Sequence, residues 1–219
     1  MKSVSLPAFD DLTLVQSAVV VKAGFRKSVG LSNLCPHNCT NAPPQVIESC
    51  GLTFDSVETA YQHKKARFFE SRLFDKANYD QAYERDPTVS SQTFLSDRFL
   101  HMTPYEAKRA GGKGAFAICI SAMFLNKAKA GRLYDQICKD WFGTNVAVMR
   151  GLLDQKFSDS NPAYRDLLLS TNDRIIYEQK SRGGSVWEGG AYQENVTTSG
   201  WGLLGDLLME RRTALAVNK

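Results

Sequence analysis

Residues 55–69, which read DSVETAYQHKKARFF, form the stretch of the sequence that best predicts the fold. Its apolar residues recur at near-helical spacing, at Val57, Tyr61 and Phe68. Asp55 can cap a helix start, and Glu58 follows three residues later, as in a capping box. The stretch therefore predicts a helix.

The predicted helix carries three polar side chains on one face. Glu58, Gln62 and Lys65 are spaced so that they lie on the same side of a helix. A carboxylate, an amide and an ammonium group held together suit acid–base chemistry. The alternative is that Glu58 only caps the helix start and that Lys65 belongs to a solvated basic face. His63, five residues after Glu58, is expected to point away from the shared face.

Further elements are expected on both sides of this helix. Short strands are predicted in the β-branched run 12–21, whereas 34–53, rich in Asn, Cys, Pro and Gly, is expected to be loop. Helices are predicted from the Thr103-Pro104-Tyr105-Glu106 start to Gly111-Gly112, over 115–130 and 145–157, from Pro162, and around 203–211. Two more short strands are expected at 175–177 and 186–187. Together, these predicted helices and strands indicate an α+β protein, a helix-dominated single domain with a small β component.

The composition is that of an ordinary globular protein. The net charge is +4, from 27 basic and 23 acidic residues. A charge of this size does not by itself indicate a nucleic-acid binder, but it is compatible with an anionic ligand. No stretch is apolar enough for a membrane span, and Asp10 and Asp11 fall where a signal peptide needs an apolar run. Five cysteines, an odd number, argue against a disulfide framework and favour a cytoplasmic location.

Two local patterns invite a metal or phosphate-loop interpretation that the sequence does not support. Four potential ligands gather in one region, namely Cys35, His37, Cys39 and Cys50. No second closely spaced pair completes a tetrahedral zinc site, so no metal site is predicted. The glycines around Lys113 lack phosphate-loop spacing and end a helix, so they are predicted to form a turn.

Short motifs follow one another along most of the chain. They are Gly30-Leu31-Ser32-Asn33, the run from Ser56 to Gln62, Lys65-Ala66, Ala107-Lys108, Trp141, Met149, Lys156-Phe157, Asn161, the run from Leu168 to Thr171, Glu178, Trp187, Gly200, Leu204-Gly205, Leu208-Met209 and Arg212. In this order and spacing they resemble the NADAR/YbiA-like family of N-glycosidases, from about residue 25 to residue 212. On this basis residues 1–24 are an N-terminal strand and extension, and residues 25–213 are a NADAR/YbiA-like domain.

The resemblance implies a YbiA-like fold and a hydrolase that cleaves a glycosidic C–N bond without a cofactor. Family members act on early riboflavin-pathway intermediates, releasing ribose 5-phosphate, or remove ADP-ribose from guanine in nucleic acid. The expected partner is therefore a small nucleotide-like substrate or an ADP-ribosylated nucleic acid, and not a membrane.

The resemblance also implies which residues form the site. Glu58 and Lys65 are expected to be catalytic, because cleavage builds positive charge on the sugar that a carboxylate can stabilise while it orients water. The expected substrate-binding residues are Ser32, Asn33, Gln62, Lys108, Trp141, Lys156, Trp187 and Glu188. The two tryptophans would sandwich the base and the lysines would hold phosphate. The alternative for each tryptophan is core packing, and for Lys156 it is a stem that flanks a buried helix stripe.

The sequence departs from the family pattern at three positions. Gly184 stands where Asp is expected, Gly202 where Asn is expected, and Gly112 where Arg is expected. Glu188 is a candidate substitute for the missing Asp. The departures leave two alternatives open: a catalytically altered module that binds ADP-ribose or a nucleotide, and an interaction protein with a decayed pocket.

Overall fold

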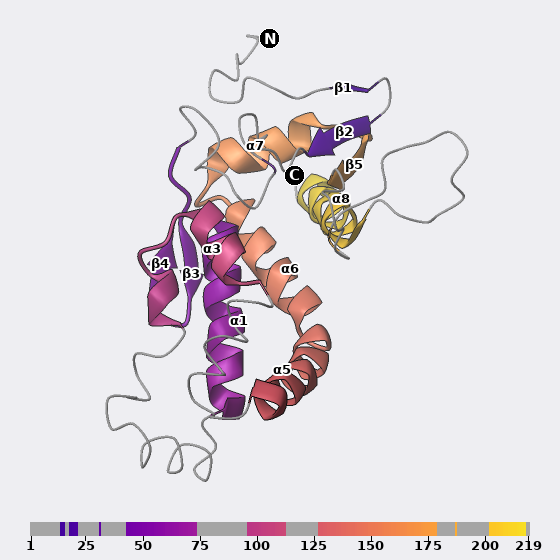
Figure 1. Ribbon diagram of the computed structural model, residues 1–219. Coiled ribbons are helices and arrows are strands. Elements are labelled where there is room, and N and C mark those ends of the chain that lie inside the picture. Colours follow the sequence, from indigo (N-terminus) through magenta and orange to yellow (C-terminus); the bar gives the residue numbers. More distant parts are fainter. Residues whose placement is uncertain are drawn as a thin grey trace, which may run out of the picture. The chain divides into compact units, whose positions relative to one another are not determined.

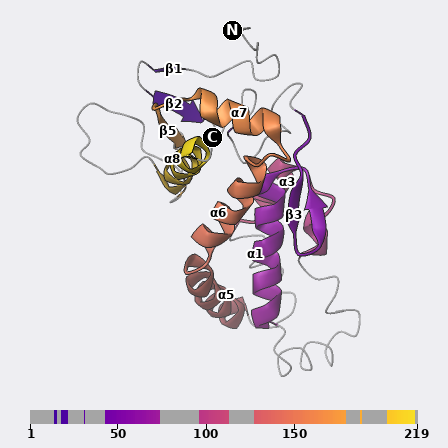
Figure 2. The same cartoon turned by 180° about the vertical axis from the view of Figure 1, so that it is seen from behind.

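The computed structural model describes residues 14–15, 18–21, 31, 43–73, 96–112, 127–178, 187 and 202–217. These residues form a helix-dominated α+β structure, as the sequence predicts (Figures 1 and 2). The chain divides into two compact units. The first contains Met1–Ile47, Asp55–Val57 and Arg150–Lys219, and the second contains Glu48–Phe54 and Glu58–Met149.

The longest helix of the second unit is α1 (Val57–Leu73), which confirms the helix predicted from residues 55–69. It begins at Val57, one residue later than a capping box based on Asp55 would place it. Its buried side chains include Tyr61 and Phe69. Glu58 lies in the first turn, so the polar face starts at the N-terminal end of the helix.

A β-hairpin precedes α1, and here the loop expected over 34–53 is wrong. Strands β3 (Ile47–Ser49) and β4 (Leu52–Phe54) pair with each other. The two residues between them, Cys50 and Gly51, have φ values of 55° and 77°. Positive φ at both central positions is the signature of the tight turn whose twist suits a hairpin. The Cys-Gly pair was therefore a hairpin signal within a stretch whose composition resembles loop.

Helix α3 (Pro104–Ala110) follows a single 3-10 turn, η1 (Asp97–Phe99), and begins as the sequence predicts. Thr103 accepts a hydrogen bond from the backbone N–H of Glu106, and the Glu106 carboxylate accepts one from the backbone N–H of Thr103 at 2.9 Å. This capping box satisfies two backbone donors that the first turn would otherwise leave unpaired. Gly111 forms the C-terminal cap, where the sequence also places the end of the helix.

Helix α5 (Lys127–Phe142) lies beside α1 in both views (Figures 1 and 2). Aromatic rings join the two helices. Trp141 contacts Tyr61 and Phe68, with ring centroids 5.5 and 5.4 Å apart, and Phe69 lies 5.5 Å from Tyr134. Most of the helix predicted over 115–130 lies outside the described residues, whose α5 begins at Lys127.

The first unit contains a three-stranded sheet that brings distant parts of the sequence together. Strands β1 (Leu14–Val15) and β2 (Ala18–Val21) are antiparallel, and β2 pairs in parallel with β5 (Ile175–Glu178). Helix α8 (Gly202–Val217) packs on β5 (Figure 1). These elements confirm the strands and the last helix predicted from the sequence.

Helices α6 (Asn145–Lys156) and α7 (Pro162–Ser170) also form where they are predicted. Trp187 lies in a turn rather than in the short strand expected at 186–187. Among the helices within the described ranges, none combines the length and the apolar character needed to cross a membrane.

Several motif residues of the second half of the chain hold the first unit together. The Asn161 side chain accepts a hydrogen bond from the backbone N–H of Val46 at 2.9 Å and donates one to the Val46 carbonyl at 3.1 Å. Arg212 of α8 donates to the Thr171 hydroxyl at 2.8 Å and to the Arg174 carbonyl at 2.7 Å. Because these polar groups are partly or fully buried, loss of either side chain would leave hydrogen-bonding groups unpaired.

Candidate active site

The candidate site is centred on Glu58, a carboxylate that is almost fully buried in the second unit. Its side chain is 7% exposed, and the Gln62 amide donates a hydrogen bond to its Oε1 atom at 2.8 Å. Gln62, one turn further along α1, is itself 8% exposed. The predicted shared face of Glu58 and Gln62 is therefore present as a direct contact.

Lys65 lies on the same face, where its ammonium group is held by the end of α3. Its Nζ atom donates to the Gly111 carbonyl oxygen at 2.7 Å and lies 5.9 Å from the centre of the Phe69 ring. A carbonyl at the C-terminal end of a helix is a favourable partner for a cation, because the helix dipole leaves it partially negative. Lys65 is thus a fixed charge within the site and not part of a solvated basic face.

The electrostatics of Glu58 combine burial with nearby positive charge. Burial raises the pKa of the Glu58 carboxyl above its ordinary value and is the largest effect on it. The charge of Lys108, the hydrogen bond from Gln62 and the charge of Lys65 lower this pKa, in that order. Lys108, which lies on α3, is therefore the charge that acts most strongly on the carboxyl.

Lys65 is shifted in the opposite direction. Burial lowers the pKa of the Lys65 ammonium, and electrostatic interactions with Cys138 and Glu58 partly offset this effect. Raising the pKa of an acid and lowering that of a nearby base brings both closer to neutral pH. Opposed shifts of this kind, each caused mainly by burial, are characteristic of sites that carry out acid–base chemistry.

Two residues at this site are absent from the sequence prediction. Gly111 was expected only to end a helix, and yet it contacts both Gln62 and Lys65. Cys138 on α5 interacts electrostatically with Lys65. Neither residue carries a local signal for this role, because both reach the site through the packing of helices distant in sequence.

Trp141 is an interior residue of the same unit. Its side chain is 4% exposed, and its ring lies against those of Tyr61 and Phe68. These contacts correspond to the packing alternative for this tryptophan. Its stacking on a substrate base stays a prediction.

His63 points away from Glu58, as its position in α1 predicts. Its ring is 2% exposed and lies 5.0 Å from the ring of Phe54 in the hairpin, and no donor or acceptor among the described residues reaches its Nδ1 atom. Burial is the largest cause of a lowered His63 pKa, and the Arg67 charge adds to it. His63 therefore belongs to the packing of the hairpin on α1.

The remaining predicted site residues lie elsewhere in the chain. Lys156, in the first unit, is fully buried, and its ammonium lies 5.2 and 5.3 Å from the ring centres of Phe157 and Tyr164. Trp187 is half-buried in the same unit, and its carbonyl accepts a hydrogen bond from Leu204. Three predicted residues lie outside the described residues: Ser32, Asn33 and Glu188.

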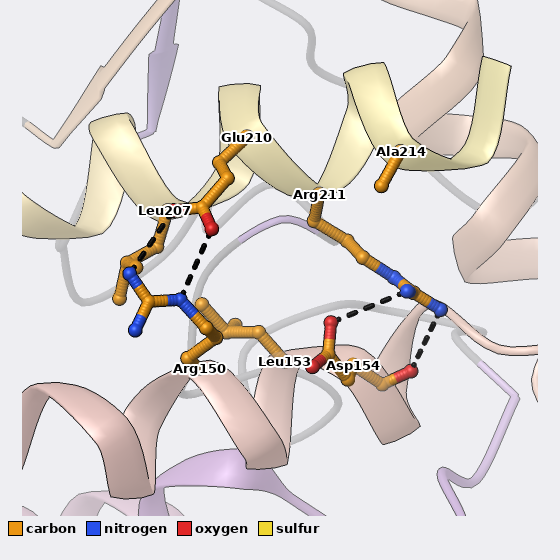
Figure 3. Close-up of a pocket in the computed structure, with 7 residues that line it drawn as sticks. All are labelled: Arg150, Leu153, Asp154, Leu207, Glu210, Arg211 and Ala214. Atoms are coloured by element: carbon orange, nitrogen blue, oxygen red, sulfur yellow. Dashed lines mark hydrogen bonds and ion pairs between the residues drawn. The ribbon is translucent and has the colours of Figure 1, made fainter. Parts of the chain in front are cut away.

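A cavity of about 230 Å³ opens in the first unit between α6 and α8 (Figure 3). Its charged walls are paired with each other: Arg150 with Glu210 at 3.1 Å, and Arg211 with Asp154 at 3.3 Å. None of the predicted site residues lines it. Because its charges are mutually neutralised, the cavity offers less to an ionic ligand than the Glu58 cluster does.

The described part of the chain contains no group of three His, Cys, Asp or Glu side chains placed to hold a metal ion. Of the four loop ligands considered from the sequence, Cys50 is exposed in the hairpin turn and the other three lie outside the described residues.

Comparison with known protein families assigns the sequence to one of them. The sequence matches the NADAR domain over residues 22–216, which is most of the chain and includes every predicted site residue. No curated protein matches the chain. Residues of both compact units fall within the matched range. The chain therefore belongs to the NADAR domain family, which is associated with N-glycosidase-like activity.

Proposed function

We propose that this protein is a hydrolase that cleaves the N-glycosidic bond of a ribosylated, nucleotide-like substrate. The observation that carries the proposal is the buried Glu58 carboxyl, which is bonded to Gln62 and lies within reach of the charges of Lys108 and Lys65. A buried carboxylate in a setting of positive charge is suited to a reaction whose transition state gains positive charge on a sugar. The family membership supports the same bond type.

In the proposed reaction, water attacks the anomeric carbon of the ribose as the C–N bond breaks. The electron pair of that bond goes to the nitrogen of the leaving base, which takes up a proton from solvent, while Glu58 afterwards returns to solvent the proton that it accepts. Glu58, as the carboxylate, accepts a proton from the attacking water and stabilises the oxocarbenium-like sugar. A pKa raised by burial makes the Glu58 carboxylate a stronger base than an exposed glutamate.

The two lysines have different expected roles. Lys108 is exposed on α3, so its ammonium is available to a substrate phosphate while it also acts on Glu58. Lys65 donates a hydrogen bond to the Gly111 carbonyl, so we expect it to balance the charge of Glu58 and not to bind phosphate. Lys156 and Trp187 stay candidates for phosphate and base contacts, together with Ser32, Asn33 and Glu188.

The substrate classes that fit are riboflavin-pathway intermediates and ADP-ribose conjugates, including ADP-ribosylated nucleic acid. The small net charge of +4 favours the free metabolite over a nucleic acid. We expect the reaction to take place in the cytoplasm, because Cys50 and Cys138 are free thiols.

The test is hydrolysis of a panel of substrates by wild type and by Glu58→Gln. The panel contains riboflavin-pathway intermediates, NAD, ADP-ribose and ADP-ribosylated DNA, with release of ribose 5-phosphate or ADP-ribose as the signal. We expect Glu58→Gln to lower kcat by about 10²- to 10⁴-fold, the usual contribution of a general base. Glu210→Gln, an exposed carboxylate in the other unit, is the matched control and should keep wild-type rates. Equal rates for wild type and Glu58→Gln would contradict the assignment of Glu58 as the catalytic base.

The second candidate is a module that binds ADP-ribose or a nucleotide without turning it over. Gly202 favours it: this residue opens α8 with φ of 73°, a backbone that Gly and Asn adopt more readily than other residues. Gly202 thus has a backbone that Asn could also adopt, but it lacks the side-chain amide of Asn. Calorimetry discriminates the candidates, since tight binding of ADP-ribose with no product would favour the binding module.

A further inference from the structure

Gly111 has a backbone that does not itself require glycine. It caps α3 with φ of −74° and ψ of −3°, in the right-handed region that any residue adopts. In this conformation glycine has no advantage over alanine, and glycine loses more conformational freedom on folding. The reason for glycine therefore lies in what surrounds the residue.

The neighbour of Gly111 is the carboxamide of Gln62. A Cβ atom built on Gly111 would lie less than 3.0 Å from the Cδ, Oε1 and Nε2 atoms of Gln62, closer than real Cβ contacts allow. The same carboxamide donates to Glu58 at 2.8 Å. Gln62 therefore reaches Glu58 through the space that a side chain at position 111 would fill.

Few other contacts fix the Gln62 carboxamide. Its Nε2 atom is bonded to Glu58, and no donor from the described residues reaches its buried Oε1 atom. Among the described residues, the hydrogen bond to Glu58 and the close fit against Gly111 thus position the group. Displacing it by even about 1 Å would break the bond to Glu58, because hydrogen bonds weaken steeply beyond their normal length.

The carbonyl of Gly111 makes a second contact with the same cluster, since it accepts the hydrogen bond from Lys65. Both Gln62 and Lys65 act on the charge of Glu58. We propose that Gly111 is a positioning residue of the Glu58 site, whose missing side chain makes the slot for the Gln62 carboxamide and whose carbonyl anchors Lys65. Its effect on turnover rests on the proposed function, but its effect on Glu58 does not.

The test is a double-mutant cycle of Gly111→Ala and Gln62→Ala, read out on Glu58 itself. Gly111→Ala fills the slot but keeps the carbonyl, so it isolates the steric part of the proposal. The Glu58 pKa is measured by NMR titration of its ¹³C-labelled carboxyl, with Glu58→Gln used to assign the signal. We expect each single variant to raise this pKa by a similar amount, because each removes the same hydrogen bond. The double variant should match Gln62→Ala alone.

Turnover provides the second readout of the cycle. We expect Gly111→Ala to lower kcat/KM on the order of 100-fold, as misplacement of a site group by about 1 Å can. Adding Gly111→Ala to Gln62→Ala should cause no further loss. Gly131→Ala, where a Cβ on α5 meets open space, is the matched control and should leave both readouts at wild-type values.

Each outcome decides the proposal. An unchanged Glu58 pKa in Gly111→Ala, or a further rise in the double variant, would overturn it. If Gly111→Ala does not fold, the double variant decides: a melting temperature equal to that of Gln62→Ala supports the slot, and an unfolded double variant rejects it. If no protein of the set turns over any substrate, the proposed function fails while the titration still tests Gly111.

Discussion

Burial of Glu58 affects the stability of the fold as well as the reaction. The fold raises the pKa of this carboxyl above 4.5, so it favours the protonated form. Such a group stabilises the fold fully below its unfolded pKa, and this contribution is lost as the pH rises through its folded pKa. Above its folded pKa, the ionised Glu58 carboxylate therefore makes the fold less stable than a neutral side chain of the same shape would.

We predict that Glu58→Gln raises the melting temperature at pH 7–8 while it abolishes most activity. The gain should shrink as the pH falls towards 4, because wild-type Glu58 is then protonated in both the folded and the unfolded chain. The measurement is the melting temperature of wild type and variant at several pH values. A difference that stays constant between pH 4 and pH 8 would show that the charge of Glu58 is not what destabilises the fold.

At the residue scale, the sequence predicts contacts within one helix but not those between helices. The spacing of Glu58 and Gln62 is sufficient to predict their contact, because helix geometry alone brings i and i+4 together. The bond from Lys65 to Gly111 joins residues 46 positions apart, so no periodicity could predict it. It depends on how α3 and α1 pack, which is also why Gly111 could be identified only as the end of a helix.

At the scale of the element, the N-terminal cap of α3 governs the helix that carries Lys108 and Gly111. We predict that Thr103→Ala lowers the free energy of unfolding by about 1 kcal/mol, the usual cost of losing such a cap. That corresponds to a fall in melting temperature of roughly 2–4 °C in a chain of this size. Urea unfolding monitored by circular dichroism measures the change.

Thr213→Ala is the matched control for this variant. Thr213 is exposed on α8, and its hydroxyl donates to the Met209 carbonyl of its own helix, so its loss should change the free energy by less than about 0.5 kcal/mol. If both threonine variants have the same stability, the capping box of α3 contributes nothing measurable.

The elements themselves were predictable to different degrees. Helices α3 and α7 begin with proline in the first turn, and such local signals predict helix starts well. The hairpin of β3 and β4 was missed because two three-residue strands provide too short a pattern against a background rich in Asn and Pro. Its signal was the Cys50-Gly51 turn, which composition alone does not reveal.

At the scale of the whole molecule, the sheet of the first unit joins the two ends of the chain. Strand β2 lies between β1 and β5, with Ala18 opposite Ile175 and Val21 opposite Glu178. The sequence predicts that these strands exist, but not that they pair, because a parallel pairing over such a distance leaves no local pattern. The domain match begins at residue 22, directly after β2.

We predict that β2 stabilises the fold although it precedes the matched range. Deleting residues 1–21 removes β2 and leaves the edge of β5, on which α8 packs, without its parallel partner. Backbone groups left unpaired cost about 1–3 kcal/mol each when buried, so the melting temperature should fall by roughly 5 °C or more. Deleting residues 1–13, which end before β1, is the control and should leave it near the wild-type value. Hydrogen exchange at Ile175–Glu178 localises the effect, and protection that survives the longer deletion would mean that β5 does not depend on β2.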